Sequence, residues 1–270
     1  MIANALTIAG SDSGGGAGIQ ADLKTFSALG VYGASVLTAL TAQNTREVRA
    51  IHDLPADFIA EQIDTVYDDI RFDAVKIGML SQPAVIEAVA AGLGRHGADN
   101  VVIDPVMVAK SGDNLLQPDA VDSLRDRLLP MALVVTPNLP EAGVLLGEAP
   151  ARDEVAMEAA CQRLLGFGPR WVLLKGGHLD GPESVDLLAG GGDVIRLAAP
   201  RVDTANTHGT GCTLSSAVAA GLARGLDVPD AAARAKTYLS AALAAADSLD
   251  VGSSHGPVHH FHGVWEAPNQ

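Results

Sequence analysis

Short apolar runs alternate along the chain with longer stretches that have helical spacing. The runs have the length and composition of buried strands and lie at residues 5–9, 34–41, 74–77, 101–103, 133–135 and 171–174. The intervening stretches predict helices at about residues 19–29, 55–70, 83–93, 118–128, 139–146, 154–165, 211–226 and 229–248. Two further runs, 184–188 and 193–197, flank a glycine-rich turn and predict a hairpin. This alternation predicts an α/β fold with a mostly parallel central sheet and helices on both faces.

Polar side chains follow several of these predicted strands. They are Gln43, Asp104, Asn138 with Glu141, and Lys175. Because right-handed crossovers bring the carboxyl ends of parallel strands to one edge of the sheet, we expect these side chains to share one cleft.

A glycine-rich loop, GSDSGGGAG at residues 10–18, follows the first predicted strand. It lacks the Gly-Lys-Ser/Thr of a P-loop, and Ile19 stands where a dinucleotide fingerprint needs its last glycine. A ligand-binding loop and a flexible turn therefore both remain open. In the helix after it, Asp22 and Lys24 are predicted to face solvent, and Asp53 is a candidate N-cap for the helix that starts at Pro55.

The segment from Thr204 to Leu226 begins as a polar loop and continues into a helix of small apolar residues. Its turn, Gly209-Thr210-Gly211, lets successive N–H groups point at one spot, and the helix start adds partial positive charge there. The sequence therefore predicts an anion-binding site, with Cys212 in the first helical turn beside it. A cysteine at that position is expected to have a lowered pKa.

Composition limits the class of protein. The chain has 270 residues, 48% of them hydrophobic, which predicts a single domain over residues 1–270. A net charge of −14 argues against nucleic-acid and anionic-membrane partners. Two distant cysteines favour a reducing cytoplasm, and we expect no signal peptide and no membrane span. The histidines of the tail (255, 259, 260 and 262) match no zinc spacing and predict a plain surface segment.

The predicted chemistry is phosphoryl transfer. This reaction needs N–H donors for developing charge, a cation such as Lys175 for the phosphates, and carboxylates such as Asp104 and Glu141 for Mg²⁺. The chain has neither the Gly-x-Ser-x-Gly elbow of a hydrolase nor a His-Glu-x-x-His zinc helix.

Five segments together resemble the hydroxymethylpyrimidine/phosphomethylpyrimidine kinases of thiamine biosynthesis, a branch of the ribokinase-like superfamily. They are GSDSGGGAGIQAD (10–22), LTAQNT (40–45), DPVM (104–107), TPNLPE (136–141) and THGTGCTLSS (207–216). The resemblance covers nearly the whole chain. It implies ATP as co-substrate, Mg²⁺, a homodimer, and two successive phosphorylations of an aminopyrimidine.

The resemblance also implies roles for the residues that contact ATP. Gly209, Thr210, Gly211 and Cys212 surround the transferred phosphoryl group, and Lys175 lies near the ATP phosphates. Glu141 acts on Mg²⁺ through water, Asp104 helps to set the metal environment, and Asn138 and Thr207 belong to the ATP side of the site. Cys212 occupies the position of the catalytic aspartate of sugar kinases. It is either a thiolate base or a residue that packs and positions substrate.

On the acceptor side, the resemblance implies that Gln43 hydrogen-bonds the aminopyrimidine edge and that Asp22 lies near the hydroxymethyl group. Met79 and Val106 line the ring or belong to the core, and both readings remain open.

Three alternative functions remain: a pyridoxal kinase, a non-catalytic pyrimidine-binding protein on the same fold, and a hydroxyethylthiazole kinase. Gln43 and Cys212 argue against a pyridoxal kinase, and Gln43 and the glycine-rich loop argue against a hydroxyethylthiazole kinase. An intact set of Cys212, Lys175 and Glu141 argues against a non-catalytic binding protein. Loops 10–18 and 110–114 are candidate lids.

Overall fold

The computed structural model describes residues 1–107 and 119–265, and the strands in these ranges join one nine-stranded sheet. Its order is β3-β2-β1-β4-β5-β6-β7-β8-β9. The strands are β1 (Asn4–Ser11), β2 (Tyr32–Gln43), β3 (Val48–Asp53), β4 (Ala74–Ile77), β5 (Val101–Ile103), β6 (Val134–Val135), β7 (Trp171–Lys175), β8 (Glu183–Gly190) and β9 (Asp193–Pro200). From β2 to β7 all neighbours pair in parallel, whereas β3, β8 and β9 pair antiparallel. The predicted mostly parallel sheet is confirmed.

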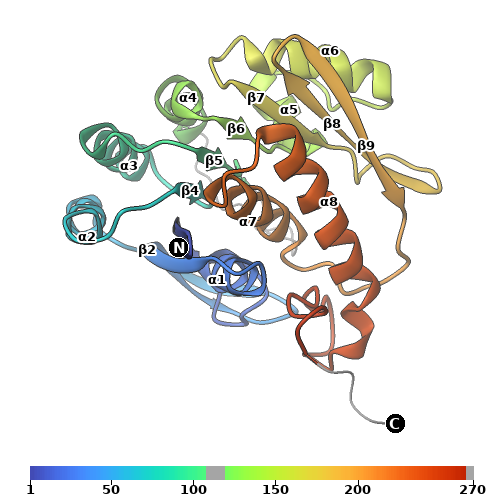
Figure 1. The fold of residues 1–270 in the computed structure, drawn as a ribbon, viewed down its shortest axis with the longest axis horizontal. Helices are drawn as coiled ribbons and strands as arrows, with labels where there is room; N and C mark the ends of the chain where they lie inside the picture. The colour runs from blue at the N-terminus through green and yellow to red at the C-terminus, as the bar shows by residue number, and fades with distance from the viewer. Residues whose placement is uncertain (108–118, 266–270) are drawn as a thin grey trace.

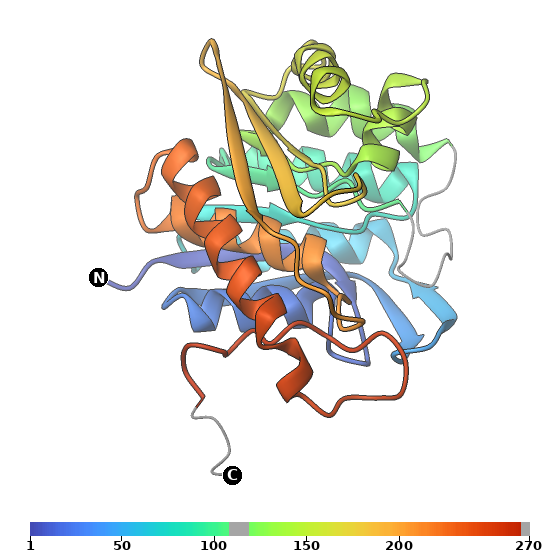
Figure 2. The same cartoon turned by 90° about the vertical axis from the view of Figure 1, so that its right-hand side faces the viewer.

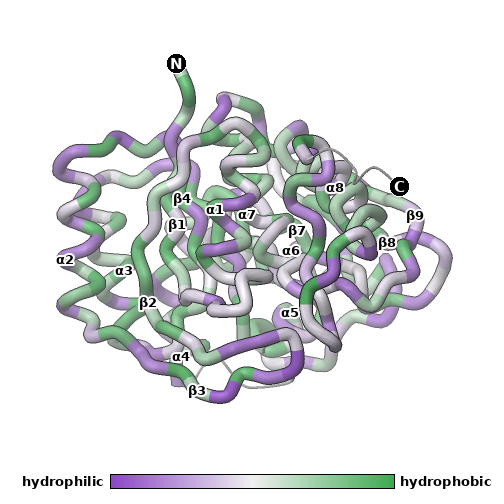
Figure 3. The backbone as a smooth tube through the Cα atoms, turned by 90° about the horizontal axis from the view of Figure 1, so that it is seen from below, coloured by the Kyte–Doolittle hydropathy of each residue, from purple (hydrophilic) through white to green (hydrophobic). Residues whose placement is uncertain are grey.

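Helices cover both faces of this sheet (Figure 1). They are α1 (Gly18–Ala28), α2 (Ala56–Tyr67), α3 (Pro83–His96), α4 (Ala120–Ser123), α5 (Leu139–Leu146), α6 (Glu154–Leu165), α7 (Thr210–Ala223) and α8 (Val228–Ala244). One hydrophobic cluster packs α2, α3, α5 and α6 on one face, and a second packs α1, α7 and α8 on the other. In Figure 3, hydrophilic and hydrophobic stretches alternate along the outer helix α2, as expected for a helix with one buried side.

Helix ends follow local sequence. Asn138 caps α5: its side chain accepts from the Glu141 N–H, and the Glu141 carboxylate accepts from the Asn138 N–H. Pro140 lies in the first turn, and Gly147 ends the helix with a φ of 69°. This capping box fixes the start of α5 where β6 ends, so the sequence alone places Glu141 at the edge of the sheet.

The structure differs from the sequence analysis at three places: a missed strand, a wrong helix cap and a helix that ends early. Strand β3 was not predicted, because its exposed residues have no apolar alternation and it forms by pairing with β2. Asp53 does not cap α2, since its carboxylate accepts instead from Ser81 (2.6 Å) and Gln82 (2.7 Å). Helix α8 ends at Ala244, before a short 3-10 turn (Ala246–Ser248). The β8–β9 hairpin was predicted and extends the sheet at one end (Figure 2).

The helix predicted at 118–128 starts at the border of the described residues, where α4 is followed by a π-helical turn (Leu124–Leu128) and a 3-10 turn (Leu129–Met131). The candidate lid at 110–114 lies outside the described residues. Within them, none of the helices is long and apolar enough to cross a membrane.

The histidine-rich tail is not the plain surface segment that its composition predicted. His259 and His260 are 8% and 4% exposed, whereas His255 is exposed. His260 contacts the Thr213 hydroxyl at 3.1 Å, and its backbone carbonyl accepts from Tyr238. Burial lowers the pKa of His260 to about 3, so its imidazole is neutral and serves packing against α7.

Candidate active site

The loop predicted to bind an anion leads into the start of α7. Gly209 precedes the helix with a φ of 79°, and a Cβ atom there would lie 1.8 Å from the carbonyl oxygen of Gly16. Only glycine fits this position. No side chain caps the first turn, so the N–H groups of Gly211 and Cys212 remain available to an anion. Thr207 lies half-buried in the preceding loop, where its carbonyl accepts from the Thr210 N–H.

The ends of β5 and β7 bring Asp104 and Lys175 to this helix start. The Lys175 ammonium donates to Asp104 Oδ1 at 2.8 Å. A Cβ on Gly211 would lie 3.2 Å from Lys175 Nζ and 3.4 Å from Asp104 Oδ2. The prediction that polar strand ends meet at one edge of the sheet is therefore confirmed for these two residues and the anion loop.

Asp104 is fully enclosed by hydrogen-bond donors. Besides Lys175, it accepts from the hydroxyls of Thr136 (3.1 Å) and Ser215 (3.3 Å), and it is 1% exposed. Burial by itself raises the pKa of Asp104, but Lys175 and Lys76 outweigh burial and hold the pKa below its usual value. Asp104 is therefore an ionised partner that fixes Lys175 in place.

Glu141 completes the cluster, with its carboxylate 3.8 Å from Lys175 Nζ. Burial raises its pKa to about 7, an effect that Lys175 opposes and Asp104 reinforces. A buried carboxylate with spare acceptor capacity fits a water-mediated Mg²⁺ site, since Mg²⁺ keeps several waters and takes few protein ligands. In the ranges 1–107 and 119–265, no group of three or more His, Cys, Asp or Glu could hold a metal directly.

The thiol pKa of Cys212 is raised, not lowered as the sequence predicted. Burial raises the pKa of its thiol to about 11. Lys76 opposes this effect, and the carboxylates of Asp22 and Asp104 add to it. The expected lowering by the helix start assumed an exposed thiol facing only positive charge, whereas Cys212 faces charges of both signs. In the free protein it is a neutral thiol at physiological pH.

Asp22 is buried rather than solvent-facing, and Lys76 was not predicted at all. Both side chains are 0% exposed, and Lys76 Nζ donates to Asp22 Oδ2 at 2.9 Å. The same carboxylate accepts from the hydroxyls of Thr7 and Ser216, each at 2.6 Å. Lys24 is half-buried and donates to the carbonyl of Gly15 at 2.7 Å.

Two sequence signals could have found this pair. Asp22 lies three residues after Ile19 and four before Phe26, and therefore on the buried side of α1. Lys76 is the one charged residue in a fully buried four-residue strand, a position that demands a carboxylate partner.

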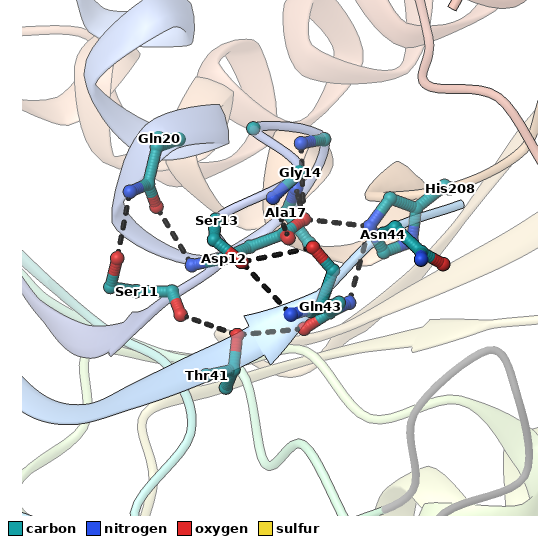
Figure 4. A network of polar contacts seen from close by, with 12 residues as sticks. Ser11, Asp12, Ser13, Gly14, Ala17, Gln20, Thr41, Gln43, Asn44 and His208 are labelled. Atoms are coloured by element: carbon teal, nitrogen blue, oxygen red, sulfur yellow. Dashed lines mark hydrogen bonds and ion pairs between the residues drawn. The ribbon is translucent and has the colours of Figure 1, made fainter. Parts of the chain in front are cut away.

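The acceptor side of the site lies across the glycine-rich loop, where Gln43 ends β2 (Figure 4). The Gln43 side-chain oxygen is 3.1 Å from the Thr41 hydroxyl, and its nitrogen is 3.5 Å from His208 Nε2. Met79 and Val106 are half-buried at the ends of neighbouring strands, outside the fully buried core. A Cβ on Gly10 would lie 2.6 Å from Met79 Cε, so Met79 lies against the loop.

The family model described as phosphomethylpyrimidine kinase matches residues 12–259. The chain is 58% identical over 266 residues to a hydroxymethylpyrimidine/phosphomethylpyrimidine kinase of Rhizobium meliloti (strain 1021), covering 98% of this chain and 100% of that protein. It is 56% identical over 262 residues to the enzyme of the same name from Escherichia coli (strain K12), covering 97% and 98%.

Solved structures are similar over the whole fold. The ADP complex of Bacillus subtilis pyridoxal kinase has a TM-score of 0.89 and 40% sequence identity, with 96% of this chain and 98% of that chain covered. The pyridoxal kinase of Staphylococcus aureus in complex with AMP-PCP and pyridoxal has a TM-score of 0.89 and 34% identity, with 98% and 95% covered. Phosphomethylpyrimidine kinase from Clostridium difficile 630 has a TM-score of 0.79 and 45% identity, with 89% and 98% covered.

Proposed function

The chain belongs to the phosphomethylpyrimidine kinase family, and from this premise we propose how its residues divide the work of the reaction. The protein phosphorylates 4-amino-5-hydroxymethyl-2-methylpyrimidine with ATP, and then phosphorylates the monophosphate to the pyrophosphate, in thiamine biosynthesis. The observation that carries the assignment of roles is the open start of α7 beside the Lys175–Asp104 pair.

The γ-phosphoryl group binds at Gly209, Thr210, Gly211 and Cys212, where backbone N–H groups face it. Lys175, held by Asp104, supplies the positive charge that the phosphate oxygens need during transfer. Asn138 and Thr207 flank this position on the ATP side, and Asn138, the N-cap of α5, is adjacent to Lys175 at the end of β7 through an isolated backbone bridge. A net charge of −14 makes these local donors the means of capturing ATP.

Glu141 and Asp104 would set the environment of Mg²⁺. Glu141 would hold the ion through water, whereas Asp104, whose oxygens accept from three donors, would act through Lys175. The bound ion would supply the charge that neutralises the phosphates.

The pyrimidine ring binds between Gln43, Met79 and Val106. The Gln43 amide offers both a donor and an acceptor to the amino–ring-nitrogen edge. Asp22 is enclosed by Lys76, Thr7 and Ser216, and Lys76 is itself fully buried, so this pair acts on the reacting groups through its charges, which bear on Cys212, rather than by contact.

Cys212 accepts the proton of the substrate hydroxyl. Because its pKa is raised to about 11, the thiolate is a minor species at neutral pH. A rate that depends on this thiolate rises about tenfold per pH unit between pH 6 and 9. We expect that slope in kcat of the wild type and a flat profile in Cys212→Ala, with turnover at pH 8 lowered about 100-fold and ATP affinity little changed. A flat wild-type profile, or near-normal turnover of the variant, eliminates the base role.

The acceptor is tested directly by ADP release with purified protein, ATP and Mg²⁺. We expect turnover with hydroxymethylpyrimidine and with its monophosphate, and little with pyridoxal or hydroxyethylthiazole. Pyridoxal kinase remains the second candidate, because pyridoxal kinases are among the structures with a TM-score of 0.89. Turnover with pyridoxal alone would assign the protein to that activity, and pyrimidine binding without turnover would make it a binding protein.

We also propose that the protein is a single-domain, cytoplasmic homodimer. We infer a single domain, since the strands in the described ranges join one sheet. Both cysteines are free thiols, which suits the reducing cytoplasm. A homodimer is supported by the end strand β3 with its exposed Ile51 and by the exposed Leu40 on the neighbouring strand β2.

A further inference from the structure

Asp12, in the glycine-rich loop, is bound by four N–H donors (Figure 4). Its carboxylate accepts from the backbone of Gly14 (2.8 Å), Gly16 (3.0 Å) and Ala17 (2.8 Å), and from His208 Nε2 at 2.8 Å. A carboxylate that is held ionised only accepts hydrogen bonds, so His208 Nε2 carries the proton. Burial alone raises the pKa of Asp12, but His208 and the backbone donors outweigh it and hold the pKa low.

The bond from His208 to Asp12 joins two loops that are far apart in the sequence. His208 directly precedes Gly209, the first residue of the anion site. The loops are also in close contact at two glycines: a Cβ on Gly16 would lie 2.3 Å from Cδ2 of the His208 ring, and one on Gly209 would lie 1.8 Å from the backbone oxygen of Gly16. Neither loop can shift toward the other, and the side-chain bond opposes their separation.

The same glycine-rich loop is tied to the acceptor side. Ser13 Oγ donates to the Gln43 carbonyl at 2.9 Å and accepts from the Gln43 N–H at 2.9 Å. Gln43, Ser13, Asp12, His208 and Gly209 therefore form one continuous path from the proposed pyrimidine contact to the proposed phosphoryl contact.

The far side of His208 is anchored by the C-terminal segment. Its N–H donates to the Gly256 carbonyl at 3.0 Å, and its carbonyl accepts from the Val258 N–H at 3.4 Å. The backbone of His208 is thus fixed, which leaves its side chain as a rigid support for the glycine-rich loop.

We propose that Asp12 and His208 are a positioning pair that fixes the acceptor-side loop against the anion site. The pair sets the distance between the substrate hydroxyl and the γ-phosphoryl group, and it does not contact either one. The proposal rests on the kinase function given above. Phosphoryl transfer depends mainly on positioning, and a misplacement of about 1 Å can cost about 100-fold in rate.

The test compares His208→Leu with His208→Gln. Leucine removes the donor, and glutamine places an amide nitrogen near the former Nε2 position. We expect His208→Leu to lower kcat about 10- to 100-fold with the KM for ATP within about twofold, and His208→Gln to recover most of kcat. Thr204→Val is the matched control, because it removes from the same loop the hydrogen bond to Asp247 and the acceptor of the Asn206 N–H but none of the contacts of Asp12, and it should retain wild-type kcat.

A double-mutant cycle with Asp12→Asn assigns the effect to the pair. The two substitutions should be strongly non-additive, since either one breaks the same bond. The proposal is overturned if His208→Leu keeps wild-type kcat. It is also overturned if the His208→Leu and His208→Gln variants lose kcat equally and that loss parallels their loss of thermal stability. Failure of the wild type to turn over either pyrimidine is a separate outcome, which would instead contradict the kinase function.

Discussion

At the scale of single residues, the buried ion pair of Lys76 and Asp22 influences the pKa of the Cys212 thiol. Asp22 holds the pKa of Lys76 above its usual value although burial alone would lower it, so the ammonium stays charged. That cation opposes the burial and the carboxylates that raise the pKa of Cys212. The thiol chemistry of this site therefore depends on a lysine that no motif contains.

Lys76→Met should raise the pKa of Cys212 further and slow its alkylation by iodoacetamide between pH 8 and 10 severalfold. It should also destabilise the fold by about 3–5 kcal/mol, because Asp22 is left as an unpaired buried charge. The double variant Lys76→Met/Asp22→Asn should regain most of the stability. Cys212→Ala is the control for alkylation at the other cysteine, Cys161, which is buried. Unchanged alkylation in the folded single variant would contradict the coupling.

Lys175→Met tests the cation of the phosphate site. We expect kcat to fall at least about 100-fold, because the developing charge of the phosphoryl group loses its ammonium partner. Asp104 then remains as a buried charge without that partner, so thermal unfolding must be measured beside kinetics. A variant that stays folded and keeps more than a tenth of wild-type kcat would exclude the assigned role.

At the scale of elements, helix α7 has a left-handed glycine near each end, and the two differ in their surroundings. Gly209 has a φ of 79° and no room for a side chain, whereas Gly225 has a φ of 84° and nothing within 4 Å of an added Cβ. Substituting each glycine therefore distinguishes the effect of backbone strain, which both share, from the effect of the close approach of two loops, which only Gly209 has.

Gly225→Ala should lose about 1–2 kcal/mol of stability through its backbone conformation and keep wild-type kcat. Gly209→Ala should also lower kcat about 100-fold, since its methyl group would force the glycine-rich loop away from the anion site. Steady-state kinetics and thermal unfolding of both variants check this. Equal kinetics for the two variants would show that the loop contact has no catalytic role.

At the scale of the whole molecule, β3 ends the sheet and bears Ile51, which is 38% exposed. If this edge forms the proposed homodimer, Ile51→Lys should halve the mass measured by light scattering. Val155→Lys, at an 80% exposed position on α6, is the matched control and should leave the mass unchanged. A wild-type monomer would contradict the proposed dimer directly.

The sequence by itself determined the order of the strands and helices apart from β3, the mostly parallel sheet, and the placement of Asp104 and Lys175 at strand ends and of Glu141 at the start of α5. These features depend on local periodicity, caps and turn residues, which act over a few neighbouring positions. The Asn138–Glu141 capping box and the glycine at 209 belong to the same class of signal.

Only the tertiary structure decided which charges meet. The pairs Lys76–Asp22 and His208–Asp12 join residues 54 and 196 positions apart, and strand β3 exists through its pairing with β2. The pKa of Cys212 is raised, whereas the sequence predicted a lowered value, because tertiary packing decides which charges surround the thiol. A helix start is local and favours the thiolate, whereas burial and facing carboxylates are set by packing and favour the thiol.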